Sequence, residues 1–118
     1  MTTSREGATA VKRPLQFDVD SVREAMEILA IRLALPVIVM LQHGACGHAE
    51  LMRRLDVESK QLTRVLRRLQ KHDLIERFVK VEASPVRVSY SLTSRGECWL
   101  SAVAEFAVRI ELGIGGEA

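Results

Sequence analysis

Apolar side chains recur at helical spacing along much of this chain, a pattern typical of amphipathic helices. The first predicted helix runs from residue 18 or 20 to about residue 30, with acidic side chains in its first turn, where the helix dipole favours negative charge. A second is predicted to begin near residue 33, because Pro36 is tolerated only in a first turn, and to end near the His43-Gly44 pair. Almost all of this second helix is expected to be buried.

Two further helices are predicted over residues 47–55 and 57–70, joined by a tight turn. In the shorter helix, Leu51 and Leu55 are expected to face inward. Ser59 is the predicted N-cap of the longer helix, because its hydroxyl can accept a hydrogen bond from an unpaired N–H of the first turn. At about 100° per residue, the apolar side chains of the longer helix share one narrow sector: Leu62, Val65, Leu66 and Leu69.

The opposite face of the longer helix is strongly basic. Its cationic residues are Lys60, Arg64, Arg67, Arg68 and Lys71. Residues 53–80 hold nine Lys or Arg and four Asp or Glu, a net charge of +5, although the whole chain carries only +2. A local basic patch of this kind indicates a nucleic-acid or other anionic partner. On the helix alone, a solvated basic face without a partner is the alternative.

Two β-rich runs follow, over residues 74–81 and 86–92, with residues 82–85 as the turn between them. A short helix, a tight turn, a longer basic helix and then a hairpin predict a winged helix-turn-helix, whose second helix enters the major groove. An αα-hairpin in a helical bundle is the alternative for the helix pair, but the hairpin that follows argues against it. Lys80 and Arg87 flank the tip of this wing, where cations would lie along the minor groove or its phosphates.

The last predicted helix begins after Thr93 as its N-cap and is apolar on more than one face. Its apolar residues include Trp99, Leu100, Val103, Phe106, Ala107, Val108, Ile110 and Leu112. A terminal helix on so small a domain offers one face to its own core, so the remaining apolar surface predicts a partner subunit. A monomer with an unusually apolar surface is the alternative.

The length of 118 residues is that of one domain. Residues 1–14 are expected to form a flexible tail, residues 15–112 the DNA-binding and dimerisation domain, and residues 113–118 a flexible end. The expected fold class is mostly α with a small β wing. The most apolar run, residues 28–41, is too short and too interrupted to cross a bilayer, so no membrane partner is expected.

Candidate chemistry outside the basic helix is sparse. Cys46 and Cys98 have no partner at short spacing and no accompanying secretion signal, which fits a reducing, cytoplasmic setting, and packing is favoured over redox sensing for both. The three histidines show no metal-ligand spacing and are interpreted as surface or helix-end residues. Trp99 could line a cavity for a small-molecule effector, although core or interface packing is favoured. No phosphate loop, nucleophile motif or recognisable carboxylate pair supports an enzyme or a cofactor.

Several short segments, taken in order, resemble the HxlR family of bacterial winged-helix regulators, a relative of the MarR group. They are H-A-E-L-x-x-R-L at residues 48–55, S-x-x-L-T-x-x-L-x-x-L at 59–69, L-I-E-R at 74–77 and R-V-S-Y-S-L-T-x-x-G at 87–96. The resemblance covers about residues 20 to 110. It implies a homodimer, built from the first and last helices, that binds a palindromic operator and regulates nearby genes.

The chain also departs from the family pattern. Many members begin the first helix with Cys-Pro, and in some of them this thiol senses oxidants or electrophiles. Asp20 and Ser21 occupy those positions here, so sensing by that route is not expected. The family's Gly-Gly-Lys-Trp joint between the first two helices is replaced by residues 30–33, Ala-Ile-Arg-Leu.

The favoured interpretation is a dimeric winged helix-turn-helix transcription factor with double-stranded DNA as its partner. The predicted DNA contacts are Ser59, Lys60, Gln61, Thr63, Arg64, Arg67, Arg68, Lys71, Lys80 and Arg87. The predicted dimer contacts are Val22, Met26, Trp99, Val103, Phe106 and Ile110. The rival hypothesis is a protein-interaction module that keeps this fold without binding DNA. Five cations opposite the core stripe favour DNA, because an interaction module has no need of them.

Overall fold

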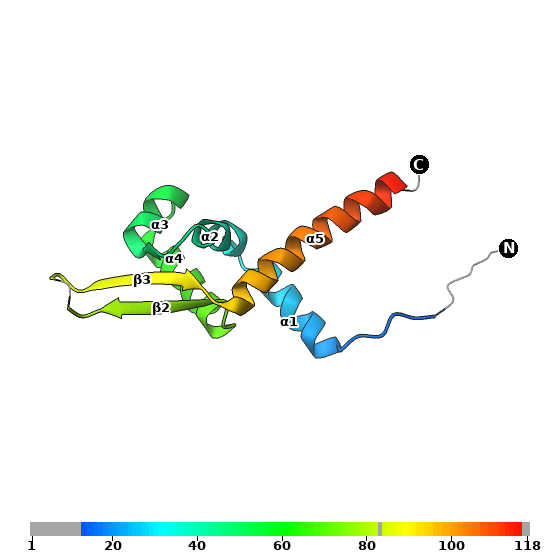
Figure 1. The fold of residues 1–118 in the computed structure, drawn as a ribbon, viewed down its shortest axis with the longest axis horizontal. Helices are drawn as coiled ribbons and strands as arrows, with labels where there is room; N and C mark the ends of the chain where they lie inside the picture. The colour runs from blue at the N-terminus through cyan, green and yellow to red at the C-terminus, as the bar shows by residue number, and fades with distance from the viewer. Residues whose placement is uncertain (1–12, 83, 117–118) are drawn as a thin grey trace.

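The structure, a computed structural model, describes residues 13–82 and 84–116. The elements, in order, are α1 (Val19–Leu29), α2 (Ala34–Leu41), β1 (Cys46–Gly47), α3 (His48–Leu55), α4 (Ser59–Lys71), β2 (Ile75–Lys80), β3 (Arg87–Leu92) and α5 (Ser94–Gly116) (Figure 1). The expected mostly helical fold with a small wing is confirmed. Most of the expected N-terminal tail, residues 1–12, lies outside the described residues, as do residue 83 of the expected wing turn and residues 117–118.

Local hydrogen bonds explain where the first and last helices begin. Asp18 caps α1, since its carboxylate accepts from the Ser21 backbone N–H at 3.1 Å and from the Ser21 hydroxyl at 2.6 Å. Thr93 caps α5 in the same way, because its Oγ1 accepts from the backbone N–H of Gly96 at 2.9 Å. The predicted cap at Thr93 is therefore confirmed, and α5 continues to Gly116, past the expected end of the domain at residue 112.

The predicted Ser59 cap is wrong by one residue. Glu58 is the N-cap of α4, with extended backbone angles of φ −77° and ψ 152°, and its side chain makes no capping hydrogen bond. The chain leaves α3 through Asp56, whose φ of 54° reverses its direction in the turn. Because the turn is completed at Glu58, Ser59 already has helical geometry and is the first residue of α4.

The expected near-complete burial of α2 is also wrong. Ala34, Val37, Ile38 and Leu41 are buried, whereas Leu35, Pro36 and Val39 are exposed. Only one face of this eight-residue helix contacts the core, and the opposite face is left uncovered. The prediction failed because the helix is apolar at nearly every position, so its sequence does not indicate which face is exposed.

The core is centred on the apolar face of α4. Leu62, Val65, Leu66 and Leu69 are buried there, as the periodicity predicted. They belong to one cluster with Leu51 of α3, with α2 and with residues 74 and 75, which lead into the wing. The basic face of α4 is consequently fixed outward by the packing of its opposite face.

The sheet has the strand order β1-β3-β2, and all pairs are antiparallel. The hairpin of β2 and β3 confirms the predicted wing and brings Lys80 directly opposite Arg87 at its outer end. The sequence missed β1, which pairs Cys46 with Tyr90 and Gly47 with Ser89. Two residues are too few to show an alternating pattern, so this strand had no detectable signal.

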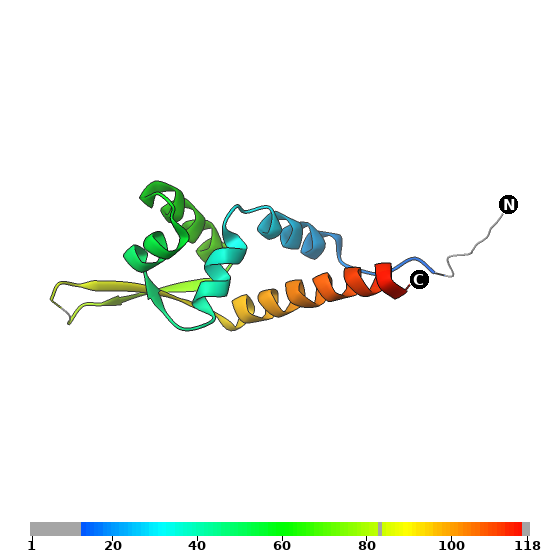
Figure 2. The same cartoon turned by 90° about the horizontal axis from the view of Figure 1, so that it is seen from above.

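Figure 2 shows α1 and α5 extending from the domain on the side opposite to the wing. The outer part of α5 leaves large apolar side chains uncovered, with Phe106 56% and Leu112 66% exposed. No helix in the described part of the chain is both long enough and apolar enough to span a membrane. The basic face of α4 and the uncovered apolar side chains of the two arms, α1 and α5, thus lie on separate parts of the surface.

Candidate nucleic-acid interface

The exposed face of α4 carries the five cations that the sequence predicted. Lys60, Arg64, Arg67, Arg68 and Lys71 are all exposed. Within residues 13–82 and 84–116, no carboxylate lies within ion-pair distance of any of them. A shallow depression of about 400 Å³ on this face is lined by Ser59, Lys60, Thr63, Arg64, Arg67 and Arg68. The charge on this face is therefore available to an external anion.

Gln61 and Thr63 lie at the sides of this face and are half-buried. The Thr63 hydroxyl is 3.2 Å from Nε2 of His48, the first residue of α3. This contact ties the two helices of the helix-turn-helix together and restricts the Thr63 rotamer. The sequence predicted surface or helix-end positions for the histidines. His48 does begin α3, but its half-buried bridge to Thr63 depends on a contact that no local spacing reveals.

The wing adds a second basic margin. Lys80 and Arg87 are exposed at its outer end, as predicted. A depression of about 460 Å³ separates α4 from the wing, and its lining includes Gln70 and Arg77. Neither residue was among the predicted DNA contacts, although Arg77 was counted among the cations of residues 53–80. Strand alternation places Arg77 on the same side as the buried Ile75, which directs it toward α4.

A separate apolar groove of about 350 Å³ lies between α1 and α5. It is lined by Val22, Ala25, Met26, Leu29, Trp99, Ala102, Val103 and Phe106. Five of the six predicted dimer residues are among them, and the sixth, Ile110, is 48% exposed one turn further along α5. The structure therefore brings the predicted dimer residues together on one surface.

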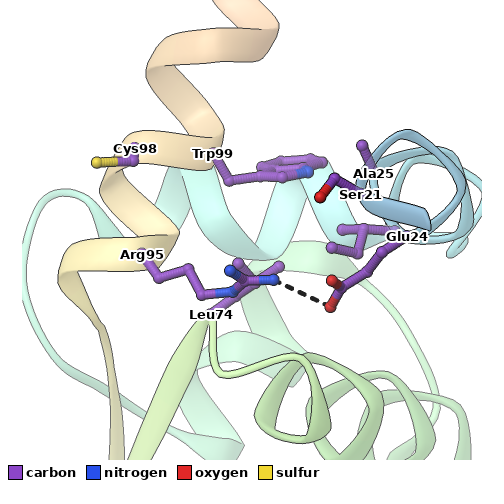
Figure 3. A pocket seen from close by; sticks show the side chains of 8 residues that line it. Ser21, Glu24, Ala25, Leu74, Arg95, Cys98 and Trp99 are labelled. Carbon is purple, nitrogen blue, oxygen red and sulfur yellow. Dashed lines mark hydrogen bonds and ion pairs between the residues drawn. The ribbon is translucent and has the colours of Figure 1, made fainter. Parts of the chain in front are cut away.

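A polar cluster joins the end of α4 to both arms. Oε2 of Glu24 accepts from Nη2 of Arg95 at 2.9 Å (Figure 3) and lies 3.0 Å from Nδ1 of His72. Nε of Arg95 also donates to the backbone carbonyl of His72 at 2.9 Å. The hydrogen bond with His72, and to a lesser degree those with Arg95, hold the pKa of the Glu24 carboxyl below its ordinary value. Glu24 and Arg95 border a cavity of about 310 Å³, whose lining also includes Leu74 and Trp99.

The cysteines differ in environment. Cys46 is buried, and burial together with the nearby Glu50 carboxylate raises the pKa of its thiol. Cys98 is exposed, and in Figure 3 its sulfur points away from the Glu24–Arg95 pair. Among the residues that the structure describes, no group of three or more His, Cys, Asp or Glu side chains is arranged to hold a metal ion.

Two helices joined by a tight turn, a basic second helix and an adjoining β-hairpin define a winged helix-turn-helix protein. The family model for the HxlR-like helix-turn-helix matches residues 28–111, and the chain belongs to this family. The match begins somewhat later than the resemblance in the sequence, which started near residue 20. The family and the fold are those of transcriptional regulators, which are not enzymes.

Solved structures support the same fold. A transcriptional regulator assigned to the MarR family from Enterococcus faecalis V583 is similar with a TM-score of 0.76 and 25% identity, over 91% of this chain and 97% of that one. A MarR-family regulator from Porphyromonas gingivalis W83 gives a TM-score of 0.67 and 29% identity, over 86% and 97% of the two chains. The reduced form of the regulator YodB from B. subtilis gives a TM-score of 0.73 and 23% identity, over 81% of this chain and 94% of that one. This similarity shows the fold alone. No curated protein matches the chain.

Proposed function

We propose that this protein regulates transcription as a homodimer that binds a palindromic operator. The observation that carries the proposal is the exposed row of five cations on α4, directly opposite its buried stripe and without an ion-pair partner in the described chain. A solvated helix face usually mixes both signs of charge, whereas phosphate recognition favours one sign. The position of this helix, second in the helix-turn-helix, supports entry into the major groove.

The two ends of α4 serve different tasks in this proposal. Residues at its front, Lys60, Gln61, Thr63 and Arg64, read base edges, with Ser59 beside them at the start of the helix. Arg67, Arg68 and Lys71, together with Lys80 and Arg87 of the wing, hold phosphates at the margin of the major groove and near the minor groove. Phosphate contacts fix the register of the protein on the duplex, while base contacts supply the sequence preference.

The homodimer rests on the groove between α1 and α5. Its lining is almost wholly apolar, and Val22, Met26 and Phe106 are each at least 40% exposed there. Burying an apolar surface of this extent is energetically favourable, and in a twofold dimer the same surface of a second copy can bury it. Two α4 helices in a twofold dimer would lie in successive major grooves, which accounts for a palindromic site.

The rival function, a protein-interaction module, draws on the same groove. An apolar groove can receive a helix of another protein as well as a second copy. The two functions differ at α4, because removal of its charge would leave an interaction module unaffected.

Selection from random duplexes tests the proposed function. The purified protein is mixed with a random DNA library, and the retained DNA is sequenced. We expect an inverted repeat whose half-sites are about one helical turn apart. Arg67→Glu should abolish retention, while Arg23→Glu, the same charge change on an exposed residue of α1, should retain the same motif. Failure to enrich any sequence, with no binding even at low salt, would reject DNA reading and favour the interaction module.

A further inference from the structure

The C-terminal end of α4 is tied to both arms by one carboxylate. Glu24 of α1 contacts His72, which caps α4, at 3.0 Å and Arg95 of α5 at 2.9 Å. The His72 side chain is only 16% exposed, whereas Glu24 and Arg95 are 41% and 49% exposed, so His72 is the packed member of a half-exposed cluster. The partners are 48 and 71 positions apart in the chain, so the cluster connects elements that no local hydrogen bond joins.

Arg95 makes the connection rigid because it binds side chain and backbone together. Its Nη2 donates to Glu24, and its Nε donates to the His72 carbonyl at the end of α4. The last carbonyls of a helix have no partner within the helix, and a cation there is favoured by the dipole. The guanidinium thus links α1, the end of α4 and the start of α5 through two hydrogen bonds in a fixed relative geometry.

The segment after α4 is held by a second set of contacts. Thr93 Oγ1 donates to the carbonyl of Asp73 at 2.7 Å, and the Thr93 backbone N–H donates to the carbonyl of Leu74 at 3.1 Å. These bonds anchor the start of α5 beside the exit from α4. Core packing fixes α4 within the helix-turn-helix, so the contacts of His72 and Arg95 act on the tilt of that unit, α4 included, relative to α1 and α5.

A small tilt at this end becomes a large displacement at the front. With 13 residues and a rise of about 1.5 Å per residue, α4 is about 20 Å long. A tilt of about 5° would move its front by roughly 1.7 Å, and the fronts of the two helices of a dimer by roughly 3.4 Å relative to each other. That distance is close to the rise of about 3.4 Å per base pair.

We propose that Glu24, His72 and Arg95 set the tilt of α4 relative to the dimer arms and thereby fix the half-site spacing that the protein accepts. These are positioning residues: they act on DNA through α4 and contact no base. The inference rests on the proposed function, in which α4 reads DNA and α1 and α5 join the subunits. It adds a specificity determinant outside the DNA-contacting surface.

The test compares operators that differ only in spacer length. Duplexes carry the selected half-sites with the native spacer or with one base pair more or fewer, and their affinities are measured by fluorescence anisotropy. Wild-type protein should prefer the native spacer by about tenfold or more, a difference of the size that one mismatched base pair produces. Glu24→Gln, which keeps the size of the side chain, should reduce this preference to within about threefold, while affinity for random DNA is unchanged.

Arg95→Ala and the double variant extend the test. Arg95→Ala should broaden the spacing profile in the same way, and the double variant should be no broader than either single one, because residues of one network are not additive. Arg23→Gln and Arg109→Gln are matched controls, since each breaks an exposed ion pair within a single helix. Both controls should keep the wild-type profile.

The outcomes separate the two proposals. If Glu24→Gln and Arg95→Ala lower affinity equally for every spacer, the cluster serves stability alone and the inference is overturned. The same holds if their profiles match wild type. If wild-type protein itself binds no duplex, the proposed function fails, and the inference fails with it.

Discussion

Gly96 packs directly against the backbone carbonyl of Leu74, so that a Cβ atom at position 96 would overlap the carbonyl oxygen. The Leu92 side chain would lie only 3.1 Å from the same atom. The first turn of α5 can therefore approach the exit from α4 only because residue 96 lacks a side chain. This close approach brings Thr93 and Arg95 within reach of residues 72 and 73.

Replacing Gly96 by Ala should destabilise the protein, although Ala is the better helix former. The backbone carbonyl cannot move aside cheaply, so we expect a loss of about 1 to 3 kcal/mol in the free energy of unfolding. Urea denaturation measures it. Gly113→Ala in the same helix is the control: a Cβ there meets nothing within 4 Å, and stability should rise by up to about 1 kcal/mol. Equal gains at both sites would contradict the close contact.

Phe106→Glu should produce a monomer or insoluble protein. The change places a charge in the apolar groove between α1 and α5, where it would be buried on dimerisation without a partner. Light scattering at micromolar concentration gives the mass. Ser101→Glu adds the same charge on the face of α5 beside Gln42 and Leu92 and should leave the dimer intact. A wild-type protein with the mass of a monomer would refute the dimer.

Oxidants and electrophiles should leave DNA affinity unchanged. Cys46 is buried and its pKa is raised, so the reactive thiolate is disfavoured. Cys98 is exposed, but it lies on α5 and is not part of the basic face of α4. Anisotropy before and after diamide or peroxide tests this. The prediction is wrong if treatment abolishes binding by wild type but not by a Cys46→Ala, Cys98→Ala double variant.

Acid should remove the stabilising contribution of Glu24. Hydrogen bonds from His72 and Arg95 lower its pKa below 4.5 in the folded protein. The contribution is therefore complete above the unfolded value and disappears as pH falls through the folded pKa. We expect the difference in unfolding free energy between wild type and Glu24→Gln to shrink from about pH 6 to about pH 3. Glu27→Gln, on the exposed side of α1, controls for the removal of one charge; a difference that stays constant with pH would argue against the cluster.

The sequence predicted the elements whose signal is local. The stripe from Leu62 to Leu69 placed α4 correctly, and the Thr93 cap and the wing followed from short patterns. The sequence also predicted that the cations of α4 are exposed, because they lie on the face opposite the buried apolar stripe. The site residues themselves stay predictions until DNA or a partner subunit is observed in contact with them.

Contacts between distant parts of the chain could not be predicted from the sequence. Glu24 and Arg95 are 71 positions apart, and no spacing rule pairs them. The bridge from His48 to Thr63 likewise depends on how α3 packs on α4. The exposed side of α2 was missed for a related reason, since apolar composition alone does not say which neighbours are present to cover it.

Substitutions in the wing and in the C-terminal half of α4 should weaken binding to all DNA sequences alike. Replacing Arg68 or Arg87 by Ala removes a proposed phosphate contact, so binding to operator and to random duplex should weaken together. The log–log salt dependence should become shallower by roughly 0.9 for each phosphate that is no longer neutralised, and by twice that in a symmetric dimer. Anisotropy titrations at several salt concentrations measure the slope. An unchanged slope would remove these residues from the interface.

The front of α4 provides the most direct test of DNA reading. Operator and random duplexes are titrated by fluorescence anisotropy with wild type, Gln61→Ala and Arg64→Ala. Each substitution should cost about 1 to 3 kcal/mol on the operator and little on random DNA, because removing a base-reading side chain removes discrimination. If Arg64→Ala binds the operator as well as wild type does, or if wild type binds no DNA even at low salt, α4 is not the reading helix.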